Sequence, residues 1–256
     1  MGKYFTVEVK PTIGVAALRG GDITNQQILS DWHGFDIPKG SARLISVVIR
    51  YAGKNGADYT PTDFELFWAK SYLGNAPGTL GGEAGAVDTF SSSWFPNIIG
   101  KTYIDASIAT NDPDLIVGNI LSVNNLNGGS AGADGPEGSS GLVLTGEPDS
   151  GTNVGYDKIY VASIAKGTHN WGASTMAING TMSTSSPVLT VDGVDAIKAL
   201  SPGDVLRDED SLLLGTVKTV DSATQVTLES NLANASTNNK LVYNTTPITL
   251  LLSFEK

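Results

Sequence analysis

Residues 42–69, ARLISVVIRYAGKNGADYTPTDFELFWA, decide how we interpret the rest of the chain. They contain two runs rich in β-branched and aromatic residues, 44–51 and 64–68, separated by a polar loop with glycine, asparagine and proline. Such runs bounded by turn-forming residues predict two strands joined as a long-looped hairpin. Both runs are largely apolar, which indicates that both faces of the pair are covered. We therefore expect this hairpin at the centre of the largest sheet, with Trp68 in the core.

The composition of the chain is typical of an all-β protein with many turns. Of its 256 residues, 40% are hydrophobic, only 16% are charged, and 30 are glycine. This length accommodates one large β domain, or one domain with a smaller companion. The low charge and the recurrent apolar runs argue against a coiled coil and against disorder.

The charge balance and the absence of cysteine exclude several classes of function. The net charge is −10, and no cluster of lysine and arginine occurs, so we expect no nucleic-acid partner. Without cysteine, the chain forms neither disulfides nor thiolate metal sites. No apolar run approaches the roughly 20 residues that span a bilayer, and residues 1–14 lack the apolar core of a signal peptide. We therefore expect no membrane partner, and either synthesis and folding in the cytoplasm or release by a route other than the usual secretory one.

Alternating or continuous apolar runs predict several further strands in the first 170 residues. These runs are 4–9, 101–108, 115–123, 142–147 and 158–167. Residues 31–40 contain glycine and proline, and we expect them to form a loop. Residues 124–141, NNLNGGSAGADGPEGSSG, have no periodicity, which predicts a mobile surface loop.

The composition changes after Trp171, and residues 180–244 are predicted to form a small β domain of their own. Its strands are expected at 186–191, 204–207, 213–220, 225–228 and 239–244, with a short helical stretch at 196–201. Residues 247–254, PITLLLSF, are too apolar for a free tail. We expect them to return to the main body beside 158–166, so that the body comprises 1–175 and 245–256 and the small domain is an insertion.

The two histidines and the acidic turns offer little sign of chemistry. His33 and His169 lie in no catalytic motif, and we interpret both as surface or turn residues. Oxygen-rich turns can bind calcium, but no acidic group here has the spacing of an EF-hand. We interpret them as solvated turn carboxylates: Asp112, Asp114, Asp134, Glu137, Asp204, Asp208, Glu209 and Asp210. Three tryptophans, Trp32, Trp94 and Trp171, are candidates for surface or subunit contacts.

In the small domain, residues 188–243 contain LSPGDVL, LGTVKTV and SATQVTL in this order. This succession of motifs resembles the β modules of virion proteins from tailed bacteriophages. The body resembles phage head-decoration proteins in the runs RLISVVI, FELFWAKS, LIVGNILSV, KIYVASIAKGTHNW and ITLLLSF.

The resemblance implies an all-β structure, with a jelly-roll-like β-sandwich body and a small barrel-like domain inserted before the last strand. It implies a non-enzymatic capsid decoration or cement protein on the outer face of the head, where it binds the major capsid protein. It also implies self-association, for which a trimer is our first expectation. On this basis we expect no catalytic, cofactor-binding or metal-binding residue, and no cofactor.

Two other functions remain open from the sequence. A tail-fibre or receptor-binding adhesin would stack Trp32, Trp94 or Trp171 on glycans of the host surface. A polysaccharide-degrading enzyme would need a pair of carboxylates across a cleft.

Overall fold

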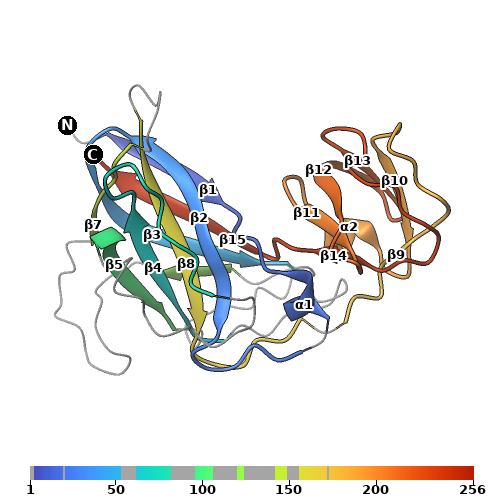
Figure 1. The fold of residues 1–256 in the computed structure, drawn as a ribbon, viewed down its shortest axis with the longest axis horizontal. Helices are drawn as coiled ribbons and strands as arrows, with labels where there is room; N and C mark the ends of the chain where they lie inside the picture. Colours follow the sequence, from blue (N-terminus) through green and yellow to red (C-terminus); the bar gives the residue numbers. More distant parts are fainter. Residues whose placement is uncertain are drawn as a thin grey trace.

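The computed structural model describes residues 3–19, 21–52, 62–81, 96–105, 120–123, 142–148, 156–171 and 173–256. The protein is all-β, as the sequence predicts: strands dominate these ranges, and the two α-helices, α1 (Val15–Leu18) and α2 (Ala196–Ala199), have four residues each. Figure 1 shows a sandwich of two sheets beside a smaller barrel-like sheet.

Two antiparallel sheets form the sandwich. The first has the order β1 (Tyr4–Val9), β15 (Ile248–Glu255), β3 (Ser41–Tyr51), β6 (Ile120–Val123), with β7 (Leu142–Thr145) also paired to β3. The second has the order β2 (Ile28–Pro38), β8 (Tyr156–Ala165), β4 (Phe64–Lys70), β5 (Ile98–Ile104). The chain alternates between the sheets from β1 to β4, and β15 returns between β1 and β3. This is the strand order of a jelly roll, which confirms the expected body.

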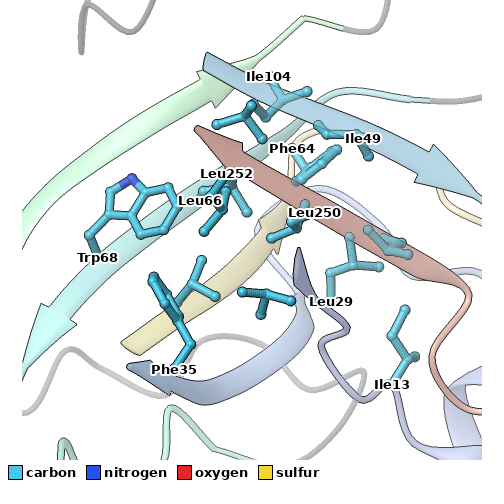
Figure 2. Packing of buried hydrophobic residues seen from close by; sticks show 14 of the residues in the cluster. Ile13, Leu29, Phe35, Ile49, Phe64, Leu66, Trp68, Ile104, Leu250 and Leu252 are labelled. Atoms are coloured by element: carbon cyan, nitrogen blue, oxygen red, sulfur yellow. The ribbon is translucent and has the colours of Figure 1, made fainter. Parts of the chain in front are cut away.

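The core lies between the two sheets (Figure 2). Buried side chains from both sheets fill it, and the largest is Trp68, which is fully buried as predicted. Its indole Nε1 donates a hydrogen bond of 2.9 Å to the hydroxyl of Thr102. Phe35 contacts both Trp68, edge-on at 6.4 Å between ring centroids, and Phe254 at 6.5 Å. Because the indole nitrogen has a partner, the ring is buried without a lost hydrogen bond.

The predicted hairpin over 42–69 is wrong. Its two runs form β3 and β4, but these strands belong to different sheets and face each other across the core. Tyr51, the last residue of β3, meets Phe64, the first of β4, edge-to-face at 6.5 Å. Two apolar strands gain the same burial from stacking across a core as from lying side by side. The apolar pattern therefore does not distinguish the two arrangements.

Two further predictions need correction. Residues 31–40 were expected to form a loop, but β2 extends to Pro38. A Cβ at Gly34 would lie 2.9 Å from the ring of Tyr160, so this glycine allows close strand packing and does not mark a turn. The last strand does return to the sandwich, yet β15 pairs with β1 and β3 in the first sheet. It does not lie beside residues 158–166, because these form β8 in the opposite sheet.

The other predicted body strands are present: β1 has the predicted bounds, β6 ends at Val123 as predicted, and β5, β7 and β8 have shifted ends. Residues 106–119, which include parts of two predicted strands, lie outside the described residues, as does the loop 124–141.

Between β8 and β15 the chain forms the small barrel-like unit. Its strands are β9 (Ala177–Ile178), β10 (Val188–Asp192), β11 (Val205–Asp208), β12 (Leu213–Ser222), β13 (Gln225–Leu228) and β14 (Val242–Asn244). They form one sheet in the order β14-β11-β12-β13-β10-β9, and a bridge between Ala177 and Leu241 joins its two ends. The unit has a core of its own, and α2 begins where predicted, with the Asp195 carboxylate capping the amide of Ile197 at 3.0 Å. The domain limits at 175, 180 and 244 stay a prediction.

The chain termini and the barrel lie at opposite ends of the sandwich (Figure 1). The residues that follow β1 and precede β15 reach the barrel, whereas Lys3 and Lys256 exchange backbone hydrogen bonds at the other end. We call the end that carries the two termini the terminal end.

Candidate functional site

A row of exposed residues crosses the first sheet at the terminal end. Tyr4, Glu255, Arg43 and Val143 are successive partners on β1, β15, β3 and β7. The Tyr4 hydroxyl donates to Glu255 at 3.1 Å, which raises the pKa of that tyrosine, and Arg43 lies 3.5 Å from the same carboxylate. These contacts are solvent-exposed and contribute little to stability. Their interest lies in the surface that they form.

Five large apolar side chains of the sandwich are exposed at this end. In the described part of the sandwich these are all the large hydrophobic residues with substantial exposure: Tyr4 (70%), Tyr72 (45%), Leu73 (80%), Val143 (58%) and Tyr156 (55%). Tyr156 is the first residue of β8 and pairs with Pro38. Tyr72 and Leu73 follow Lys70, the last residue of β4, which pairs with Ile159 near the start of β8. Strand register thus brings distant parts of the chain to one end. A gathering of exposed apolar side chains is characteristic of an interaction surface.

Leu73 is displayed by a tight turn. Residues 72–75 close the turn through two backbone hydrogen bonds between Tyr72 and Asn75, of 2.9 and 3.0 Å. Leu73 has a φ of 50°, in the left-handed region that leucine rarely adopts. The side-chain amide of Asn97 donates to the carbonyl of Lys70 at 2.8 Å and so fixes the turn to β5. The fold therefore holds an exposed leucine at a definite position.

The terminal end carries charges of both signs. Glu255 pairs with Arg43, and the Asp157 carboxylate accepts a hydrogen bond from the Gly40 amide at 2.8 Å. Lys3, Lys39, Arg43 and Lys256 all lie here, and the Lys256 ammonium donates to the Lys39 carbonyl at 2.5 Å. Exposed apolar side chains with charged groups of both signs around them fit a protein partner.

The barrel is fastened to the sandwich by a buried ion pair at the opposite end. Lys10, just after β1, lies 2.7 Å from the carboxylate of Asp204 and also donates to the Pro202 carbonyl at 2.8 Å. Asp204 accepts further bonds from the Ser201 amide at 2.9 Å and from Asn244 at 2.8 Å. Burial raises the pKa of Asp204, and Lys10 and Ser201 oppose that rise. The arrangement positions the barrel and leaves no free carboxylate oxygen for a ligand.

Asp208 in the predicted acidic hairpin is likewise structural. It is fully buried, and its carboxylate accepts from the amides of Asp210 at 3.0 Å and Leu212 at 2.9 Å. Lys240 contacts both Asp208 and Asp210, which lowers the pKa of Asp210 and raises that of the lysine. The expectation of solvated turn carboxylates is therefore wrong for Asp204 and Asp208. Within the described ranges, no group of three or more metal-ligating side chains converges.

The four other acidic residues considered as turn carboxylates, Asp112, Asp114, Asp134 and Glu137, lie outside the described residues, as does Trp94.

The histidines are strand and core residues, contrary to expectation. His169 is fully buried, with its ring stacked on Trp171 at 5.9 Å and its Nε2 3.1 Å from the Asp63 carbonyl oxygen. His33 is half-buried on β2, opposite Val161. Burial lowers the pKa of both imidazoles. In these positions the two side chains contribute to packing. The sequence did not reveal this, because a histidine outside any motif is compatible with a core position as well as with a turn.

Trp171 also belongs to the core, with 6% of its surface exposed, so its predicted role in surface contact is wrong. Trp32 is half-buried on β2 and packs beside Ile28 and Leu80.

No protein-family model and no curated protein matches this chain. No helix among the described residues has the length and apolar character to cross a membrane.

Neither the terminal end nor the Lys10–Asp204 pair is predicted by a local pattern in the sequence. The residues of each are far apart in the chain, and only strand pairing brings them together. The one local signal was Tyr72-Leu73-Gly74-Asn75, two large apolar residues followed by turn formers.

Proposed function

We propose that this chain is a non-enzymatic virion structural protein of a tailed bacteriophage, a capsid decoration or cement protein on the outer face of the head. It docks on the major capsid protein through its terminal end, and the barrel points away from the shell. The observation that carries the proposal is the set of five exposed large apolar side chains at the end opposite the barrel.

The architecture supports this role. Jelly rolls recur in viral capsid proteins, although a fold alone does not fix a function. The resemblance of the body and the inserted module to phage virion proteins adds the same expectation. A decoration protein acts through contact area, which requires a rigid, partly apolar surface of the kind that the turn at Leu73 displays.

The test is binding to capsids that lack the protein. Purified shells are mixed with the wild-type chain or with the double variant Leu73→Asp/Tyr156→Asp, and bound protein is measured by co-sedimentation. Both side chains are more than half exposed, so the variant folds normally, and its affinity falls by about 30-fold or more if they are central to the interface. The matched control is Ile197→Asp/Leu212→Asp, which alters exposed apolar residues of the barrel and leaves binding unchanged.

Electron microscopy of the decorated shell then supplies the orientation. Density for the barrel farthest from the shell agrees with the proposal. Absence of binding by the wild-type chain contradicts it, as does equal loss of binding in the two double variants.

A host-binding adhesin is the second candidate, and the exposed tyrosines favour it. Tyr4, Tyr72 and Tyr156 present aromatic rings that can stack on sugars, a role that the buried Trp171 cannot fill. A glycan array distinguishes the two candidates: saturable binding to host surface glycans, lost in Tyr156→Ala, together with no affinity for shells, would establish the adhesin.

A further inference from the structure

The outer edge of β1 carries unused backbone hydrogen-bonding groups. β1 is the end strand of its sheet and pairs with β15 alone. Lys3 and Lys256 exchange both of their backbone bonds, at 3.2 and 2.8 Å. In an antiparallel pair such exchanging residues alternate with residues whose groups point to the other side. Phe5, Val7 and Val9 therefore bond to β15.

The groups that point outward are the N–H and C=O of Tyr4, Thr6 and Glu8. In the described structure these six groups meet no protein partner. Another extended strand can form hydrogen bonds with all six groups, because its own backbone acceptors and donors alternate at the same spacing.

We propose that a second copy of this chain occupies the edge, with the two β1 strands antiparallel about a two-fold axis at Thr6. In this register Tyr4 pairs with Glu8 of the second copy, Thr6 with its own counterpart, and Glu8 with Tyr4 of the second copy. Shifting the register by two residues in either direction leaves one of the three residues unpaired. The register centred on Thr6 is thus the one that uses all the free groups of both strands.

The side chains fit the same register. Phe5, half-buried and stacked on Phe254 at 5.1 Å, comes opposite Val7 of the second copy, so the apolar layer continues from one sandwich into the next. On the outer face, Tyr4 meets Glu8, and on the inner face Lys3, which directly precedes the strand, comes opposite Val9. Like charges directly opposite each other would disfavour pairing, and this register contains none.

The contact is isologous and closes after two copies. As the self-association of the free protein it replaces the trimer expected from the sequence. It does not depend on the role proposed for the terminal end, and it places the sheets of two molecules in one continuous sheet.

The first test uses Thr6→Pro. Thr6 makes no backbone bond to β15, and proline is tolerated at an edge position whose N–H faces outward, so the variant keeps the fold. It removes one hydrogen bond from each copy. Analytical ultracentrifugation should show a wild-type dimer whose dissociation constant rises on the order of 10- to 100-fold in the variant. Thr6→Val keeps the N–H and serves as the control, with dimerisation unchanged.

A charge exchange tests the two-fold axis. Thr6 faces its own counterpart, so Thr6→Lys and Thr6→Glu each bring like charges together and dissociate the homodimer, whereas a mixture of the two variants forms a heterodimer. A wild-type monomer or trimer at high protein concentration overturns the proposal. So does a dimer that is insensitive to Thr6→Pro, or a mixture that does not associate more strongly than its components.

Discussion

Removal of the Lys10 charge tests whether the junction between sandwich and barrel is energetically important. The side chain of Lys10 is 12% exposed and that of Asp204 is 2% exposed. Lys10→Met leaves the Asp204 carboxylate buried, with only the neutral donors of Ser201 and Asn244. Breaking a buried ion pair by removing one partner costs about 3–5 kcal/mol. Because two neutral donors remain, we expect the lower value, about 3 kcal/mol.

A double-mutant cycle isolates the pair. Asp204→Asn should lower the free energy of unfolding by about 2 kcal/mol, because the Lys10 ammonium still donates to the Pro202 carbonyl and has some access to water. The double variant Lys10→Met/Asp204→Asn removes both charges and should cost only about 3 kcal/mol, which gives a coupling of about 2 kcal/mol.

Urea denaturation followed by circular dichroism measures these free energies of unfolding. The control is Arg50→Met, which breaks an ion pair with Glu8 at 2.8 Å whose side chains are 49% and 48% exposed. That pair should contribute less than about 1 kcal/mol. A coupling between Lys10 and Asp204 no larger than the effect of Arg50→Met would refute our reasoning that burial makes the junction important.

Two further predictions concern stability. Gly193 has a φ of +79°, and a Cβ there would lie 2.0 Å from the Thr175 carbonyl oxygen. Gly193→Ala should therefore lower the melting temperature of the barrel strongly. Gly21→Ala is the control and should leave the melting temperature unchanged, because the space around Gly21 is open. Burial lowers the pKa of His33 and His169, so the unfolded chain binds more protons as the pH falls below about 6.5. The free energy of unfolding should therefore decrease from pH 7.5 to pH 5.5, and equal values in urea titrations at the two pH values would contradict this.

Little of the candidate site could be predicted from the sequence. The terminal end draws Tyr4, Tyr72, Val143 and Tyr156 from four separate stretches, and each residue alone looks like an ordinary strand or turn residue. Apolar residues are usually buried, so nothing local distinguishes an exposed tyrosine from a buried one. The acidic hairpin shows the same limitation: Asp208 is buried because it caps its own turn, a role that composition does not reveal.

The all-β class, the positions of most strands and the insertion of a small β unit before the last strand are all predictable from the sequence. These features depend on local alternation, on β-branched residues and on turn formers, which act within a few residues. The partners of the strands, in contrast, are known only from the folded structure. Residues 42–69 supplied two strands as expected, but β3 and β4 lie in opposite sheets, and β15 pairs with β1 and β3. Partner choice depends on how all the strands fill one common core, and a strand that is apolar along its length carries no local mark of its neighbour.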